Sequence, residues 1–289
     1  MAVLVASGVL LAALQNSLVK KNIKKTVDSF AYSAAVYAVG SIIMYIDGGR
    51  FECAPLTKIL GLASGFLIIS ETVCSVNALR YGPMSLTIML SMSSMVVPMI
   101  PAGILWNEPM TGLQIVAAVL MLLAMALILN LFGSKKEKKT YGSIDKRWII
   151  FGSLCFLSGG LMGFPQKYQT MSAYSGEIIS YLLYAFLTAS VLSAGCMLFT
   201  MKKTHDSRLS FTGKLLPSVA VCGILTAMLY ILTMEAMNVI PISVVLTVSN
   251  GGRLILVTLV DILYFKQPLG RQQAAGIALG VISILLLSI

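Results

Sequence analysis

The chain has 289 residues, of which 57% are hydrophobic and only 11% are charged. Ordinary soluble domains carry about 25% charged residues, so this composition excludes that class and predicts an all-α integral membrane protein. The net charge of +10 does not indicate nucleic-acid binding. The basic residues lie in short loops between apolar runs, where they set membrane topology.

Ten apolar runs are long enough to cross a bilayer, for which about 20 residues suffice. They cover residues 2–19, 29–46, 59–79, 84–106, 111–132, 148–164, 177–199, 215–237, 243–265 and 272–288. The first run has no basic segment before it and no cleavage pattern after it, so we interpret it as a retained helix rather than a signal peptide. The basic linker loop 134–147 divides the chain into a first repeat, 1–133, and a second repeat, 148–289.

The two halves repeat one another at a constant offset of 158 residues. The matched residues are Ala78, Pro83, Ser85 and Ser91 in the first half and Ala236, Pro241, Ser243 and Ser249 in the second. Because each half holds five spans, an odd number, the second half enters the membrane from the opposite side. The sequence therefore predicts ten transmembrane helices as two inverted five-helix repeats, a common build for secondary transporters.

Each half closes with a turn, such as Trp106-Asn107-Glu108-Pro109, before a span rich in Ala, Leu and Gly. The fourth span follows the segment Ala78-Leu79-Arg80-Tyr81-Gly82-Pro83-Met84-Ser85. With five plus five spans, the chain resembles the drug/metabolite transporter (DMT) superfamily, in its ten-helix EamA-like branch. The resemblance implies a substrate cavity between the halves, alternating access and a multi-pass protein of the cell (inner) membrane.

The orientation predicted from charge differs from the one usual in that superfamily. Loops that follow odd-numbered spans hold 17 of the 21 Lys and Arg residues. Cytoplasmic loops are the ones enriched in Lys and Arg, so both termini are expected on the extracytoplasmic side. Bacterial members of the resembling family usually keep their termini inside.

Two opposite charges, Glu71 and Arg253, lie near the middle of apolar spans. A charge at this depth is costly, so the two are expected to meet each other or a substrate. One interpretation is a substrate-binding pair, in which Arg253 takes an anionic group and Glu71 takes a cationic group or a coupling proton. The other is a fixed ion pair that joins the halves. Ser249 and Asn250, one turn before Arg253, are candidates to bind the same ligand.

The central spans of both halves contain small residues at matching positions. Gly251-Gly252 corresponds to Ser93-Ser94, which precedes Pro98 and Pro101. We expect both spans to be interrupted there, with Ser94 lining a substrate cavity, because interrupted spans mark transporter binding sites. The alternative is that the small residues only allow close helix packing.

Other candidates are aromatic or lie near span ends. Phe164 and Tyr230 are possible cavity walls, although an aromatic residue within a span more often faces lipid or the core. Polar and basic residues at the ends of spans one and six are either gating contacts or interfacial side chains that snorkel to water. This group comprises Asn16, Lys20, Gln166 and Lys167. Asp261 lies nearer the interface and is either hydrated there or part of a gate.

These observations favour a secondary active transporter of a small polar or zwitterionic, amino-acid-like metabolite, with protons as a candidate coupling ion. An exporter of amphipathic cationic compounds is the alternative, and a membrane structural subunit or enzyme is a third class. No HExxH, GxSxG or Walker A motif occurs, and the five cysteines form no CxxC, so we expect no catalysis, cofactor or metal. The expected partners are the lipid bilayer and the substrate, for a monomer or homodimer.

Overall fold

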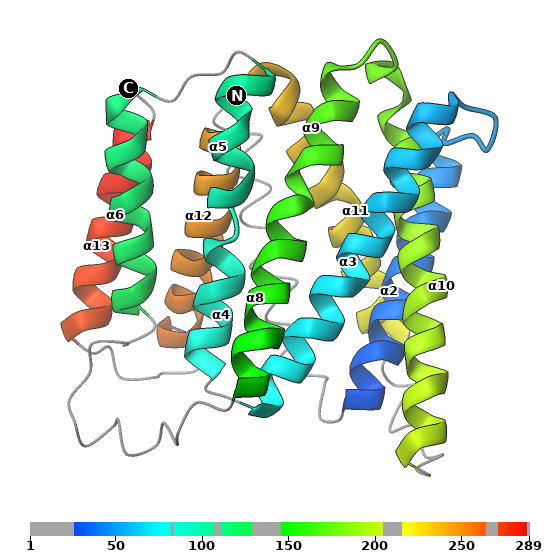
Figure 1. Ribbon diagram of the computed structural model, residues 1–289, viewed down its shortest axis with the longest axis horizontal. Coiled ribbons are helices and arrows are strands. Elements are labelled where there is room, and N and C mark those ends of the chain that lie inside the picture. Colours follow the sequence, from blue (N-terminus) through cyan, green and yellow to red (C-terminus); the bar gives the residue numbers. More distant parts are fainter. Residues whose placement is uncertain are drawn as a thin grey trace. The chain divides into compact units, whose positions relative to one another are not determined.

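The computed structural model describes residues 26–81, 84–106, 111–128, 146–204, 216–263 and 271–287. Within these ranges every regular element is a helix and no strand occurs (Figure 1). The elements are α2 (Thr26–Ile46), α3 (Pro55–Tyr81), α4 (Met84–Ser93), α5 (Val96–Leu105), α6 (Gly112–Ile128), α8 (Lys146–Leu161), α9 (Gly163–Met171), the 3₁₀ helix η1 (Ser175–Glu177), α10 (Ile178–Thr204), α11 (Leu216–Val239), α12 (Ile242–Leu263) and α13 (Arg271–Leu287).

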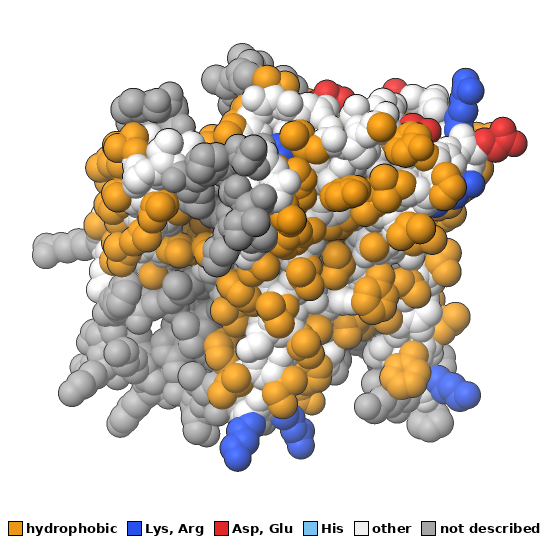
Figure 2. All heavy atoms as spheres, turned by 45° about the horizontal axis from the view of Figure 1, so that its top comes forward, with side chains coloured by type: hydrophobic (Ala, Val, Ile, Leu, Met, Phe, Trp, Pro, Cys, Tyr) orange, Lys and Arg blue, Asp and Glu red, His pale blue; other side chains and the backbone are white. Residues whose placement is uncertain are grey.

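The predicted spans two to ten each contain a described helix, while the first span, 2–19, lies outside the described residues. Five helical stretches are long and apolar enough to cross a membrane. They are Ser29–Ile46, Pro55–Ala78, Lys146–Met171, Ser175–Lys202 and Leu216–Val239. Many large hydrophobic side chains on them are exposed, as a lipid-facing surface requires. Figure 2 shows hydrophobic side chains over much of the described surface in view, with most of the charged side chains toward its upper and lower margins. The chain is therefore an all-α protein of the multi-pass membrane type.

The described residues form two compact units. The first contains residues up to Ile69 and Pro165–Asn238, and the second contains Ser70–Phe164 and residues from Val239 onward. Each unit thus contains helices from both predicted repeats. The linker loop 134–147 separates the repeats in the sequence, but the two compact units do not coincide with the repeats.

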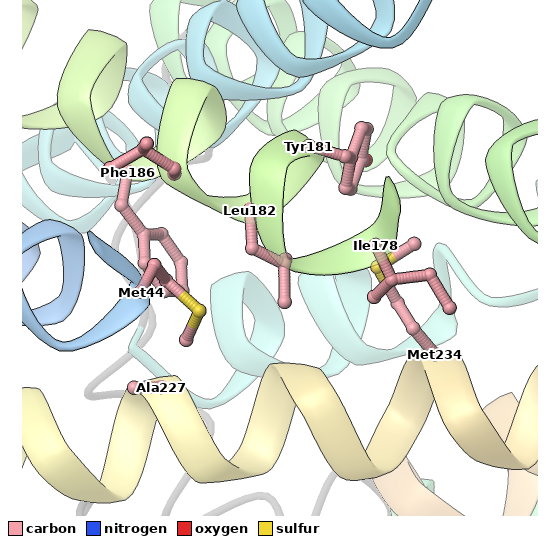
Figure 3. Close-up of a cluster of buried hydrophobic side chains, with 8 residues drawn as sticks. Met44, Ile178, Tyr181, Leu182, Phe186, Ala227 and Met234 are labelled. Carbon is pink, nitrogen blue, oxygen red and sulfur yellow. The ribbon is translucent and has the colours of Figure 1, made fainter. Parts of the chain in front are cut away.

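The first unit has a core between α2, α10 and α11, which Figure 3 shows. The Phe186 ring of α10 lies 5.2 Å from the Tyr230 ring, nearly perpendicular to it, and 5.8 Å from the Tyr37 ring. A Cβ on Gly40 of α2 would lie 3.0 Å from the same Phe186 ring. The missing side chain at Gly40 therefore lets α2 and α10 approach around an aromatic centre, and Figure 1 shows these two helices side by side.

The core of the second unit lies between α6, α12 and α13 and is rich in methionine, which adapts to irregular gaps. Met121 and Met125 of α6 are buried there with Met95 and Ile255. A Cβ on Gly251 of α12 would clash with Met121, so this glycine allows close helix packing. The packing interpretation of Gly251 is thus supported.

The predicted interruption occurs in only one of the two central spans. Span four is broken, because α4 ends at Ser93 and α5 begins at Val96. The matching span nine is the continuous helix α12, so the expectation of a break at Gly251-Gly252 was wrong. Glycine retains its N–H and lowers helix propensity by only about 1 kcal/mol, which packing overrides.

Candidate functional site

The second unit contains a cluster of polar side chains around Glu71, in the carboxyl-terminal part of α3. Glu71 is half-buried in a 27-residue apolar helix, ten residues before its end at Tyr81. At 1.5 Å per residue it lies about 15 Å from that end. Its Oε1 accepts a hydrogen bond from the Ser91 Oγ of α4 at 2.9 Å. A serine hydroxyl therefore stabilises a carboxyl group deep within an apolar segment.

Two more serines, Ser93 and Ser94, lie at the break in span four. Pro98 has no N–H to donate to the Ser94 carbonyl, and its ring disfavours the helix one turn before it. The Ser94 carbonyl instead accepts the Val97 N–H at 3.0 Å, in a tighter turn. Ser94 is only 6% exposed, and the Ser93 Oγ is buried with no hydrogen-bond partner in the described structure. The break thus supplies hydroxyl groups that a polar ligand can use.

Two adjacent glycines of α8 complete the cluster. A Cβ on Gly159 would lie 2.9 Å from the Ser94 Oγ and 3.1 Å from the Glu71 Oε1. A Cβ on Gly160 would instead overlap Val97 and lie 2.7 Å from the Ser94 carbonyl oxygen. Gly160 therefore serves the backbone packing of α8 against the break, whereas Gly159 leaves a bare stretch of backbone that faces two polar side chains. The cluster, defined by Glu71, Ser91, Ser94 and Gly159, is called the Glu71 cluster below.

The other predicted polar ligands lie on α12, which packs against α5, α6 and α13 in the same unit. Ser249 and Asn250 are half-buried there. Arg253 and Asp261 belong to the same helix, but their side chains lie outside the described residues, as do Asn16 and Lys20. The expected meeting of Glu71 and Arg253 therefore stays a prediction.

The first unit holds a second buried polar group, centred on Lys167 of α9. Lys167 is only 1% exposed, and its Nζ donates to the Met237 carbonyl of α11 at 2.8 Å. Met237 lies in the last turn of α11, and the residue four positions later, Pro241, has no N–H to offer. Instead of snorkelling to water, Lys167 caps a helix carboxyl end, where a positive charge is favourable. The neighbouring Gln166 is also buried, at 5% exposure.

A chain of hydrogen bonds continues from α9 to the start of α3. The buried Gln169 donates from Nε2 to the Tyr174 carbonyl at 2.7 Å and to the Thr57 Oγ1 at 3.3 Å. Thr57 donates in turn to the Glu177 carboxylate at 2.6 Å, which also accepts the Ala54 N–H at 3.1 Å. A carboxylate at a helix amino end is favourable, so Glu177 fastens the start of α3 to the segment before α10.

The two predicted aromatic ligands have aromatic partners of their own. Phe164 lies 6.0 Å from the Trp106 ring, at the end of α5. Tyr230 packs on Phe186 in the core of the first unit. The described structure thus brings Glu71 and Ser94 together but places Tyr230 in the other unit.

Sequence reasoning gave no site role to Ser91 and Gly159, or to Thr57 and Glu177. A signal existed for Gly159, since Ser158-Gly159-Gly160 is a run of small residues within an apolar span. No comparable signal marked Thr57, whose partners come from a segment more than 100 residues away. Across the described residues, His, Cys, Asp and Glu form no group able to hold a metal ion.

No protein-family model matches the chain, and no curated protein matches it. Solved structures do match, 29 chains in all. One, described only as the crystal structure of a protein, superposes with a TM-score of 0.78 at 13% sequence identity, covering 98% of this chain and 94% of that chain. At this identity the likeness shows a shared fold alone.

Proposed function

We propose that the protein is a secondary active transporter of a small polar or zwitterionic, amino-acid-like metabolite, and that Glu71 is its central binding residue. The observation that carries the proposal is the Glu71 cluster. A carboxyl group, serine hydroxyls and a broken helix meet at one place in an apolar unit. Irregular backbone at membrane depth is tolerated where it is buried in protein or lines a watery cavity, and transporters bind substrates at such breaks.

The proposal extends to the architecture. Ten spans in two inverted repeats, as in the DMT superfamily that the chain resembles, would let the two sides of the membrane reach one site alternately. The extracytoplasmic termini follow from the Lys and Arg bias, and the cell membrane follows from the resemblance. A reporter that is active only in the cytoplasm, fused to the carboxyl terminus, tests the orientation. A strong signal from this reporter would reject it.

A zwitterion carries one positive and one negative charge, and the two candidates Glu71 and Arg253 carry the opposite charges. In this proposal Glu71 takes the ammonium group and Arg253 takes the carboxylate, with Ser249 and Asn250 as further ligands. Glu71 also carries a coupling proton when the substrate is absent. The buried cation Lys167 has a different task, because its Nζ already caps α11.

The test is transport of radiolabelled alanine and phenylalanine into vesicles containing the purified protein, with and without an imposed pH gradient. We expect Glu71→Gln and Arg253→Ala each to abolish transport, while Glu52→Gln, which alters an exposed loop carboxylate, retains it. Loss in Glu71→Gln alone would favour the export of cationic compounds, with Arg253 only structural. Transport by both variants at the level of the Glu52→Gln control would reject the site.

A further inference from the structure

We propose that the start of α8, together with the end of α3, binds the headgroup of an anionic phospholipid. The site, called the α8 headgroup site below, consists of Tyr81, Lys146, Arg147 and Trp148. None of these residues belongs to the Glu71 cluster, so the proposal does not depend on the proposed transport. Three observations carry it: an exposed cation held by an aromatic ring, an indole fastened beside it, and an exposed apolar stripe that continues from a second cation.

The first observation is the contact that positions Arg147. The Arg147 guanidinium lies over the Tyr81 ring, 5.5 Å from its centroid. The same ring stacks on the Phe151 ring, with centroids 5.9 Å apart and planes at 10°. Arg147 and Phe151 are four residues apart on α8, so they share one face of the helix, and Tyr81 at the end of α3 packs against both. This packing holds an exposed cation at the start of α8.

The second observation is the position of Trp148. Its Nε1 donates to the Thr87 Oγ1 of α4 at 2.9 Å, and Thr87 is only 1% exposed. The start of α8 is thus fastened to α4 as well as to the end of α3, and Figure 1 shows these three helix ends near one another. Trp and Tyr are the residues enriched at the headgroup level of a bilayer. Tyr81 and Trp148 therefore favour a position of Lys146 and Arg147 among the lipid headgroups.

The third observation is an exposed apolar stripe that continues from Lys146 along α8. Lys146 is itself exposed, and four large apolar side chains on the same face of the helix are between 44% and 59% exposed. These side chains are Ile150, Leu154, Leu157 and Leu161. At 100° per residue they and Lys146 fall within about 80° around the helix axis, and at 1.5 Å per residue the stripe is about 22 Å long. This length exceeds the hydrocarbon half-thickness of about 15 Å, so a cation followed by such a stripe matches a headgroup followed by acyl chains.

The chemistry of the two cations favours an anionic phospholipid over a zwitterionic one. Ammonium and guanidinium groups donate charge-assisted hydrogen bonds to anionic oxygens such as those of phosphate, at about 2.7–2.9 Å. Phosphatidylcholine carries a trimethylammonium group that cancels its phosphate charge, whereas phosphatidylglycerol keeps a net negative charge. In the sequence Asp145 precedes the two cations, and residues 145–147 together remain net positive. The Lys and Arg bias predicts that this end of α8 is cytoplasmic, and the cytoplasmic leaflet is the negatively charged one.

The experiment measures which lipid contacts Trp148. The chain has two tryptophans, so Trp106→Phe, which keeps an aromatic ring at position 106, leaves Trp148 as the one tryptophan. The whole chain with this substitution is reconstituted into phosphatidylcholine vesicles that contain brominated phosphatidylglycerol or brominated phosphatidylcholine. The bromine lies near the glycerol end of the acyl chains and quenches tryptophan fluorescence on contact, so quenching against the mole fraction of brominated lipid gives the relative affinity. We expect phosphatidylglycerol to be preferred by about fivefold or more, the factor that one Lys or Arg near an anionic surface provides.

Variants in the same background separate the site from a general attraction of the protein for anionic lipid. The double variant Lys146→Gln/Arg147→Gln should quench equally with the two lipids. Lys146→Gln alone changes an exposed side chain, so it gives a second measurement if the double variant fails to fold, and we expect it to reduce the preference severalfold. Lys202→Gln removes an exposed charge near the end of α10 and should leave the preference unchanged. Equal quenching before any charge is removed, a preference that survives both site variants, or an equal loss in Lys202→Gln would each overturn the proposal.

Inorganic phosphate distinguishes a lipid site from a site for the free ion. When phosphate replaces chloride in the buffer at constant ionic strength, the preference for phosphatidylglycerol should stay unchanged, because the ion has no acyl chain to lie along the apolar stripe. Loss of the preference in phosphate would assign the α8 headgroup site to the free ion and overturn the lipid proposal.

Discussion

Replacing Lys167 by methionine tests whether this buried lysine stabilises the carboxyl end of α11. Methionine has a similar length and apolar stem, so Lys167→Met keeps the packing of a side chain that is 1% exposed. It removes the Nζ that lies 2.8 Å from the Met237 carbonyl. Pro241, four residues after Met237, has no N–H. The helix backbone therefore has no donor that could replace the Lys167 Nζ at the Met237 carbonyl.

The expected loss of stability follows from the carbonyl left behind. A buried polar group without a partner costs about 1–3 kcal/mol, and hydrogen bonds to charged groups contribute about 1.5–3 kcal/mol. In chains longer than 150 residues each kcal/mol moves the thermal midpoint by about 2–4 °C. Lys167→Met should therefore lower the midpoint by about 2–12 °C.

The assay is thermal unfolding of the purified protein in mild detergent, followed by circular dichroism at the helix band. The matched control is Lys202→Met, which removes the same charge from an exposed position near the end of α10 and should leave the midpoint within about 1 °C, as surface substitutions usually do. A Lys167→Met midpoint equal to that of the control would refute the capping role and return Lys167 to the candidates for a gating contact.

Three further predictions concern the first unit. Thr57→Val keeps the volume of a fully buried side chain but removes the hydroxyl that Glu177 accepts, and it should cost about 1–3 kcal/mol of stability in the same unfolding assay. Burial raises the pKa of the Cys53 thiol, and the charge of Glu177 raises this pKa further, against a lowering by a nearby lysine. In a variant with Cys53 as its one cysteine, iodoacetamide should react more slowly at pH 8 than with free cysteine, and Glu177→Gln should speed the reaction, because only the thiolate reacts. Gly65→Ala places a Cβ 2.6 Å from α10 and should lower the thermal midpoint, whereas Gly195→Ala should not lower it.

Length and polarity were sufficient to predict most helix bounds. The predicted span 215–237 became α11 at Leu216–Val239, and 272–288 became α13 at Arg271–Leu287. Within a membrane the backbone must satisfy its hydrogen bonds internally, so an apolar run of this length leaves few structures other than a helix. The break after Ser93 was also predictable, because proline removes a specific N–H at a known spacing.

Contacts distant in sequence were not predictable in this way. The Lys167 side chain was expected either at the interface or as a gating contact, and nothing in the sequence pointed to the carbonyl 70 residues later that its Nζ contacts. The orphan carbonyl at Met237 follows from Pro241, yet nothing local identifies which donor will reach it. Similarly, Glu71 was predicted as a site residue because a charge within an apolar span is costly in free energy. Its hydrogen bond to Ser91 depends instead on how α4 packs beside α3.

The difference between the two repeats has a physical source in a few substitutions. At the offset of 158 residues, Pro98 and Pro101 correspond to Leu256 and Leu259, and Glu71 corresponds to Leu229. Leucine supplies the N–H that proline lacks, so α12 runs without a break where span four is divided. The prolines that free backbone groups and the acid that is proposed to bind a cation are therefore in the same predicted repeat. An inverted repeat would then supply a symmetric scaffold, while the cation-binding chemistry would come from the first half alone.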